Sequence, residues 1–240
     1  MGVSGFLLAG VEPAGWGVEE EIARRHPDVA FAIGVHPQIV AEVDEATALE
    51  MVGQLAAWLG DPRRPRPAAI GELGLDAVGE RKATLERQER LFRAQLALAR
   101  EHDLPVVLHL LRAHGRALSI LRRDGLPRRG GVVHSYSGGA ELVRDYARLG
   151  LHLAVAGPVT WGGAERSRAA AAAIPDALLL VETDAPDQPP EPHRGGLNEP
   201  AYLPAIVAAL AHLRGVDARA IAALTEANAR RLFDRPAIGG

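Results

Sequence analysis

The sequence predicts an α/β fold of the (β/α)8 barrel class, TIM-barrel-like, from three observations. Short apolar runs alternate with longer amphipathic segments, the pattern of βα units around a parallel sheet. The apolar runs are nearly continuous, as expected for strands covered on both faces. The length of 240 residues suits a single α/β barrel. We therefore expect one domain over residues 1–240.

Seven apolar runs are predicted to be strands, and the amphipathic segments between them, with apolar residues every three or four positions, to be helices. The predicted strands are residues 5–10, 29–36, 68–74, 105–109, 131–134, 151–157 and 178–183. The clearest predicted helices are residues 84–102, 139–149, 202–213 and 218–233. Proline-rich stretches at 61–67 and 187–196 are predicted loops.

The composition is that of an ordinary globular protein, with 48% hydrophobic and 24% charged residues. A formal net charge of −3 argues against a broad basic surface for duplex DNA, so any nucleic-acid contact should be local. The chain has no cysteine, so a metal site would use His, Asp and Glu, and a cytoplasmic location is favoured. The N-terminal apolar run is too short for a signal peptide or a membrane span. We expect neither membrane association nor an obligate protein partner.

Five of the apolar runs end in an ionisable residue. In a (β/α)8 barrel the functional groups stand at the C-terminal ends of the strands, so these residues are candidates for the site. They are His36, Glu72, His109, His134 and Asp184. Converging on one mouth, their imidazole nitrogens and carboxylate oxygens would hold a divalent cation.

Each of these residues also has an ordinary structural explanation. A single buried histidine at a strand end is more often a hydrogen-bonded core residue than a ligand. Glu72 would then lie on a solvated rim, and Asp184 would cap a turn. As a set they favour a metal site, because several charges crowded at one barrel end are costly without a cation.

Seven motifs extend over nearly the whole chain. They are GVHP (34–37), GELGLD (71–76), LPVVLHLLRAH (104–114), GVVHSYSGG (131–139), LLLVETDAPD (178–187), NEPAYLP (198–204) and NARRLF (228–233). In order, spacing and strand-end placement they resemble the TatD deoxyribonuclease family. The resemblance implies a metal-dependent hydrolase on an amidohydrolase-type barrel, with one or two divalent cations, Mg²⁺, Mn²⁺ or Zn²⁺, as cofactors.

The resemblance also implies a role for each candidate residue. Glu72 would bridge two metals, with His109 and His134 on one of them. Asp184 would bind the other metal and orient or deprotonate the attacking water. The expected catalytic residues are therefore Asp184 and Glu72.

Two further residues are expected to contact the substrate. The resemblance places His36 of GVHP beside the substrate and not on the metal. Arg112 in HLLRAH is expected to contact phosphate, because a guanidinium matches phosphate oxygens geometrically. A helix-face arginine in water explains Arg112 equally well.

The resemblance further implies a His-x-His pair on a first strand, as ligands of the metal that Asp184 binds, and the chain has no such pair. Its first histidine is His26, in RRHPD at a predicted helix end. One βα unit of the family pattern is therefore expected to be missing, which leaves seven of eight strands. We expect this chain to be less active and less stable than a form extended at its N-terminus by that unit.

Three functions remain open on the sequence. The resemblance favours hydrolysis of DNA phosphodiester bonds from a 3′ end by metal-activated water. A related amidohydrolase-type enzyme on a small ester or amide is an alternative, because barrels of this class host many chemistries. A degenerate or truncated barrel with little activity is a third, favoured by the missing His-x-His pair.

Overall fold

The computed structural model describes residues 2–233, which divide into two compact units. Almost all of the first unit is residues 4–131, and almost all of the second is residues 132–232. The strand β5 (Gly131–Val133) lies at the boundary between them in the sequence.

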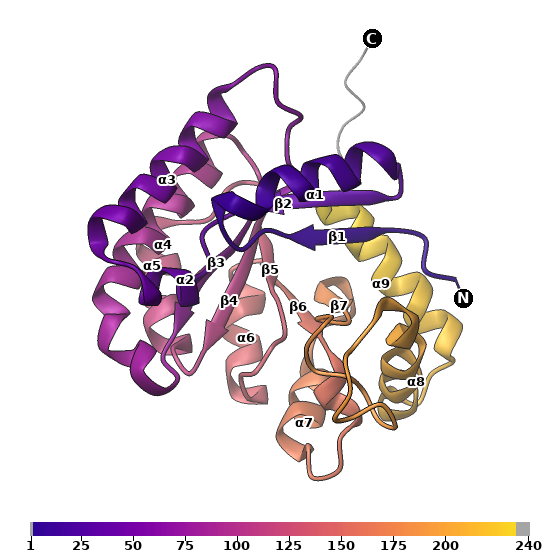
Figure 1. Ribbon diagram of the computed structural model, residues 1–240. Coiled ribbons are helices and arrows are strands. Elements are labelled where there is room, and N and C mark those ends of the chain that lie inside the picture. The colour runs from indigo at the N-terminus through magenta and orange to yellow at the C-terminus, as the bar shows by residue number, and fades with distance from the viewer. Residues whose placement is uncertain (1, 234–240) are drawn as a thin grey trace. The chain divides into compact units, whose positions relative to one another are not determined.

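Parallel strands form the centre of the first unit, and helices cover them (Figure 1). The strands are β1 (Phe6–Ala9), β2 (Val29–Ile33), β3 (Ala69–Asp76) and β4 (Val106–Leu111), each paired with the next along the chain. The helices are α1 (Pro13–Arg25), α2 (Pro37–Glu42), α3 (Glu45–Gly60), the 3-10 helix η1 (Gly79–Thr84), α4 (Leu85–Glu101) and α5 (His114–Asp124). The predicted βα alternation is confirmed in this unit.

The second unit continues the same alternation. Its strands are β5, β6 (His152–Val155) and β7 (Leu179–Val181), again parallel and paired in sequence order. Its α-helices are α6 (Ala140–Arg148), α7 (Glu165–Ala173), α8 (Leu203–Arg214) and α9 (Ala218–Phe233), with 3-10 helices η2 (Gly157–Thr160), η3 (Asp176–Leu178) and η4 (Pro200–Tyr202). The seven predicted strands are thus confirmed, as are the two helices that follow the last strand.

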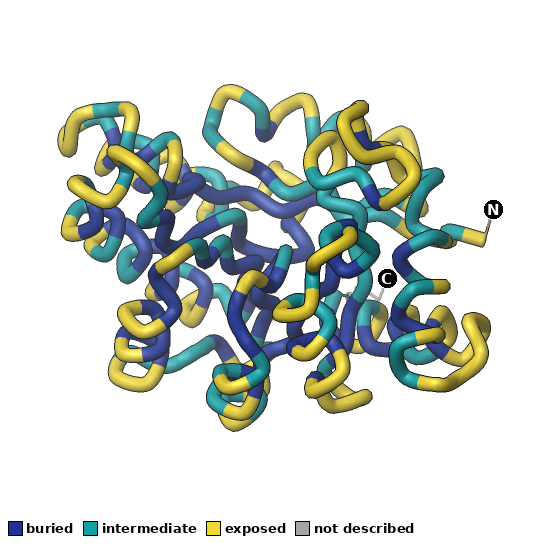
Figure 2. Tube along the Cα trace, turned by 90° about the horizontal axis from the view of Figure 1, so that it is seen from below, coloured by how far each residue is buried: buried dark blue, intermediate teal, exposed yellow. Residues whose placement is uncertain are grey.

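Burial explains why these runs form strands. Ala32, Ile33, Ile70, Leu73 and Leu75 have no exposed surface, although successive residues of a strand point to opposite faces. Both faces are therefore covered, and Figure 2 shows buried segments of the chain in the interior and exposed turns at the periphery. Full burial of each Leu or Ile side chain stabilises the fold by about 1.5–3 kcal/mol. A strand that is covered on both faces therefore needs no alternation of apolar and polar residues.

The predicted C-terminal ends of the strands differ from the observed ends by one to three residues, and three of these strands carry candidate residues that lie elsewhere than at a strand end. Glu72 lies inside β3 and His109 inside β4, because Leu73 and the residues after it continue the pairing of the two strands. The register of this pairing shifts between Ile70 and Leu73, beside Glu72, and such an irregularity re-aims a side chain. His36 lies beyond β2 and caps α2, because Pro37 favours the first turn of a helix.

Among residues 2–233 no helix has both the length and the apolar composition needed to cross a bilayer.

Candidate functional site

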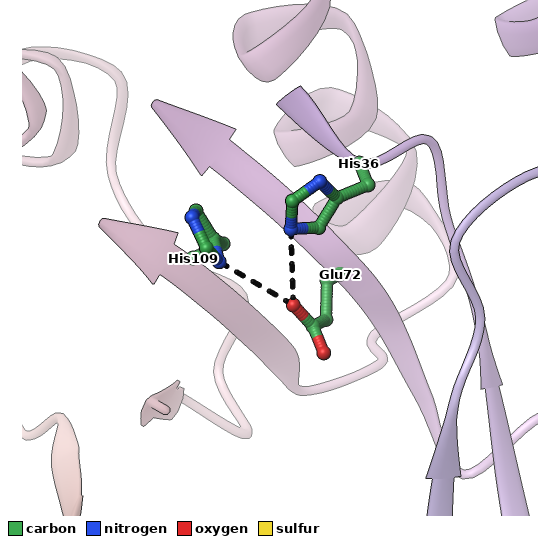
Figure 3. Close-up of side chains that lie close together, drawn as sticks. All are labelled: His36, Glu72 and His109. Atoms are coloured by element: carbon green, nitrogen blue, oxygen red, sulfur yellow. Dashed lines mark ion pairs between the residues drawn. The ribbon is translucent and has the colours of Figure 1, made fainter. Parts of the chain in front are cut away.

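Glu72 lies between two histidines in the first unit, with the three side chains pointing toward one another (Figure 3). Its Oε2 is 3.3 Å from Nε2 of His36 and 3.6 Å from Nδ1 of His109. The two imidazole rings meet edge to face, with centroids 4.3 Å apart. One ligand atom from each residue lies within 4.8 Å of the other two. Two imidazoles and a carboxylate at this spacing fit a divalent cation.

Close backbone packing holds Glu72 in this position. A Cβ on Gly71 would lie 2.5 Å from Cβ of Val107, and a Cβ on Gly34 would lie 2.7 Å from the carbonyl carbon of Gly71. Only glycine allows the strands to approach this closely. The amide of Glu72 also donates to the carbonyl oxygen of Gly10 at 2.7 Å. The backbone of Glu72 is therefore fixed on both sides.

The hydrogen bond that His36 accepts decides which of its nitrogens carries a proton. The amide of Gln38 donates to Nδ1 of His36 at 3.1 Å, so the proton of the neutral ring is on Nε2, facing Glu72. A metal-binding histidine has the opposite arrangement, since it donates from the nitrogen that does not bind the metal. His36 is therefore suited to donate a hydrogen bond, and its expected contact with substrate stays a prediction.

His109 has the arrangement of a metal-binding histidine, with one ring nitrogen toward Glu72 and the other toward an acid. Its Nε2 is 3.6 Å from Oδ2 of Asp76, a buried carboxylate that also accepts from the amide of Val78 and lies 2.8 Å from Nε of Arg81. Burial raises the pKa of Asp76, but the interactions with His109, Val78 and Arg81 outweigh it and lower the pKa below its usual range. At 3.6 Å the charged Asp76 is beyond ordinary hydrogen-bond length, but its attraction favours a proton on Nε2 of His109, which leaves Nδ1 to bind a cation.

Sequence reasoning missed Asp76, although an acid that follows an apolar run in GELGLD was a usable signal. Replacing Asp76 by Asn should weaken cation binding by about 10–100-fold, because the imidazole loses its charged neighbour. Calorimetric titration with Mn²⁺ measures this. Arg81→Ala, which leaves the Asp76 carboxylate in place, is the control and should weaken binding less. Wild-type affinity in Asp76→Asn would mean that Asp76 does not position His109.

Three consecutive glutamates on α1 behave differently. Glu20 and Glu21 form ion pairs with arginines. Oε2 of Glu19 is buried and accepts no hydrogen bond from any residue in the described part of the chain. Burial, and secondarily the charge of Glu72, raise the pKa of Glu19 to about 7. Glu19 is thus a partly buried acid that interacts electrostatically with Glu72 of the candidate site. No signal in the sequence separates it from Glu20, because positions three and four after Trp16 lie on the same helix face.

Glu19 should make the metal-free protein sensitive to pH. A carboxyl whose folded-state pKa is raised stabilises the fold below its ordinary pKa of 4.5, and that contribution is lost as the pH rises through about 7. Glu19→Gln should therefore raise the melting temperature near pH 8 by about 2–4 °C, with solvent screening allowed for, and change it little near pH 5. Glu20→Gln, which loses an ion pair, should give no such gain. If Glu19→Gln raised the melting temperature equally at both pH values, the raised pKa of Glu19 would be refuted.

The second unit contains another imidazole–carboxylate group. Nδ1 of His134 is 3.6 Å from Oδ1 of Asp184 and 3.9 Å from Oε1 of Glu182. The amide of Ser135 donates to Glu182, and the side chain of Gln188 donates to Asp184. His134 and Asp184 were expected from the sequence, whereas Glu182 was missed, although it stands in the same motif.

The backbone of this group is strained. Ser135, Asp184 and Gln188 have φ of 42°, 62° and 53°, and they are three of the five non-glycine residues in the 2–233 range with positive φ. Such conformations cost about 1–3 kcal/mol each and concentrate at functional sites. Arg112, with φ of 55°, is another. It is exposed in the turn after β4 and is not on a helix face, so its expected phosphate contact stays a prediction.

The six candidates from the sequence thus fall into three places. His36, Glu72 and His109 meet in the first unit. Arg112 is exposed in the turn after β4 of the same unit. His134 and Asp184 meet in the second unit. The chemistry available is cation binding, proton transfer by carboxylates and hydrogen-bond donation by imidazole.

Comparison with known proteins agrees with this chemistry. The family described as TatD related DNase matches residues 1–234. The uncharacterized metal-dependent hydrolase YabD of Bacillus subtilis is 35% identical over 214 residues, covering 89% of this chain and 80% of the relative. The 3'-5' ssDNA/RNA exonuclease TatD of Escherichia coli is 36% identical over 243 residues, covering 97% and 88%.

Solved structures show the same fold. The crystal structure of YjjV, a TatD homolog from Escherichia coli, superposes with a TM-score of 0.87 at 33% identity, covering 97% of this chain and 87% of that chain. The predicted α/β TIM-barrel-like fold is therefore confirmed, as is a dependence on metal. The chain belongs to the TatD family of metal-dependent hydrolases.

Proposed function

We propose that this protein hydrolyses phosphodiester bonds of single-stranded DNA, removing nucleotides from the 3′ end. The observation that carries the proposal is the carboxylate of Glu72 held between two imidazoles, 3.3 and 3.6 Å away. A relative with this activity in its name, the Escherichia coli TatD exonuclease, is 36% identical to the chain. The net charge of −3 favours a substrate gripped locally at one end over a duplex bound along its length.

The four residues expected from the sequence would hold the divalent cations. In the first unit these are Glu72 through a carboxylate oxygen and His109 through Nδ1, with Asp76 behind the imidazole. In the second unit they are His134 and Asp184. When bound, a divalent cation acts as a Lewis acid on the phosphoryl oxygen and lowers the pKa of a water molecule, so that hydroxide is available as a nucleophile near neutral pH. Mg²⁺, Mn²⁺ and Zn²⁺ all fit nitrogen and oxygen donors of this kind.

The remaining roles belong to the side chains themselves. We assign to Asp184 the removal of the proton from the attacking water, since its carboxylate is only 19% exposed and is held by Gln188. His36, with its proton on Nε2, would donate to a substrate oxygen. Arg112 would contact a phosphate with its exposed guanidinium. We also place the protein in the cytoplasm, because a chain without cysteine needs no oxidising compartment.

A substrate panel tests this function. The purified chain, freed of metal and then given Mn²⁺, Mg²⁺ or Zn²⁺, is incubated with end-labelled single-stranded DNA, the same sequence as a duplex, a phosphotriester and a lactone. We expect metal-dependent shortening of the single strand, slower attack on the duplex and little turnover of the small substrates. Turnover of a small ester without any cleavage of DNA would instead establish the amidohydrolase-type alternative. No turnover with any metal would establish a degenerate barrel.

A further inference from the structure

Arg194, in the loop that follows Asp184 in the second unit, forms a cation–aromatic pair with Trp161, the residue after η2. The guanidinium carbon of Arg194 lies 4.7 Å from the centroid of the Trp161 ring. The Arg194 side chain is 52% exposed and Trp161 is partly exposed, so molecules in solution can reach both. Neither residue belongs to the motifs from which the site was predicted.

Hydrogen bonds place this pair close to Asp184. Nε1–H of Trp161 donates to the carbonyl oxygen of Pro189 at 2.8 Å. The residue before it, Gln188, donates through its side chain to the carboxylate of Asp184. Consecutive Cα atoms are about 3.8 Å apart, so neighbouring residues of one loop hold the proposed catalytic carboxylate and the tryptophan ring.

The loop that presents Arg194 is held in place at several points. The amide of Glu191 donates to Oγ1 of Thr160 at 2.9 Å. The ring of His193, next to Arg194, stacks on Tyr202 with centroids 3.6 Å apart and an interplanar angle of 3°. A group ordered in advance loses less entropy when it binds a ligand. The part of the loop that carries Arg194 is therefore ordered before a ligand binds.

We propose that Trp161 and Arg194 form a subsite for one nucleotide of a single-stranded substrate, with the base stacked on this pair and the adjacent phosphate bound by the guanidinium. The proposal rests on the proposed function. Aromatic rings and arginine planes stack on any base, and arginine also pairs with phosphate. In the free protein Nη1 of Arg194 lies 3.6 Å from Glu191, and a phosphate would take the place of that carboxylate.

Binding without catalysis tests the subsite. Anisotropy of a labelled oligodeoxythymidine is measured with metal-free protein in EDTA, for wild type, Arg194→Ala and Trp161→Ala. Each substitution should weaken binding about tenfold, the loss of one stacked base. Arg194→Ala should also lower the slope of log K against log salt by about 0.7, the value of one phosphate contact on a single strand, and Trp161→Ala should not. Glu191→Gln should tighten binding, because it removes the competing carboxylate.

A second arginine–tryptophan pair in the chain provides the matched control. Arg64 lies 3.9 Å from the Trp58 ring in the first unit and also pairs with Glu20. Arg64→Ala removes the same type of charge and the same type of stack. Because this pair is not part of the proposed subsite, the substitution should leave oligonucleotide binding and its salt slope unchanged. An equal loss in Arg64→Ala and Arg194→Ala would mean that only general charge matters, which would overturn the subsite.

The ligand and the fold are controlled separately. An oligomer with abasic sugars keeps the phosphates but has no base. Wild type and Trp161→Ala should therefore bind it with equal affinity. If Trp161→Ala disturbs the loop, Trp161→Phe, which keeps a ring, should restore most of the affinity. Wild-type affinity in both Arg194→Ala and Trp161→Ala would refute the proposal. A chain that binds through this pair but cuts no DNA would refute the proposed function and leave the subsite standing.

Discussion

Replacing Asp184 by Asn is expected to reduce turnover of single-stranded DNA by about 10²–10⁴-fold, the usual contribution of a positioned general base. An amide is the same size as a carboxylate and still accepts the hydrogen bond from Gln188, so the melting temperature should change little. Steady-state kinetics and thermal unfolding of the same preparation measure both quantities.

Asp187 provides the control for this experiment. It lies three residues after Asp184, its side chain is exposed, and its backbone amide donates to the carbonyl oxygen of Asp184 at 2.8 Å. Asp187→Asn should therefore keep full activity. An Asp184→Asn protein with wild-type kcat would remove Asp184 from the proton-transfer role.

Replacing Glu72 by Gln is expected to weaken divalent cation binding by about 100-fold or more, beyond the 10–100-fold typical of losing a residue that only orients a ligand. The neutral amide removes the negative charge between His36 and His109, where a cation would otherwise be attracted. Calorimetric titration of metal-free protein with Mn²⁺ and with Zn²⁺ measures the affinity.

Glu86→Gln on the exposed surface of α4 is the matched control, because it removes the same charge away from the two histidines. Its cation affinity should equal that of wild type. Unchanged affinity in Glu72→Gln would mean that Glu72 is not a ligand, and it would leave His109, His134 and Asp184 as the proposed ligands.

The fold could be predicted from the sequence because burial on both faces leaves a simple pattern. Residues 29–33 are apolar throughout, and residues 69–75 are interrupted only by Glu72; amphipathic segments lie between such runs, and both became strands. Strand ends were harder to predict. A glutamate at 72 suggests an end, but β3 continues to Asp76 because its pairing with β4 resumes after a register shift that no local pattern encodes.

The sequence could propose residues for a candidate site but not their finer chemistry. His36, Glu72 and His109 could be chosen because each follows an apolar run. Which histidine nitrogen carries the proton depends on the amide of Gln38 and the carboxylate of Asp76, and these contacts exist only in the folded chain.

Glu19 shows the same limit on the sequence. Three consecutive glutamates look alike in the sequence, which does not show that Glu20 and Glu21 pair with arginines while Oε2 of Glu19 accepts no hydrogen bond from residues 2–233. The Trp161–Arg194 pair lies outside every motif, because the two residues are brought together by a loop that has no regular pattern.

Metal-dependent hydrolysis through Glu72 is tested by the release of nucleotides from single-stranded DNA labelled at either end, by wild type and by Glu72→Gln, with Mn²⁺ and with EDTA. Wild type with Mn²⁺ is expected to release a 3′ label first and to shorten 5′-labelled DNA stepwise. EDTA or the loss of Glu72 should abolish both. Release that survives in EDTA, or that is as fast in Glu72→Gln as in wild type, would contradict a metal-dependent phosphodiesterase built on Glu72.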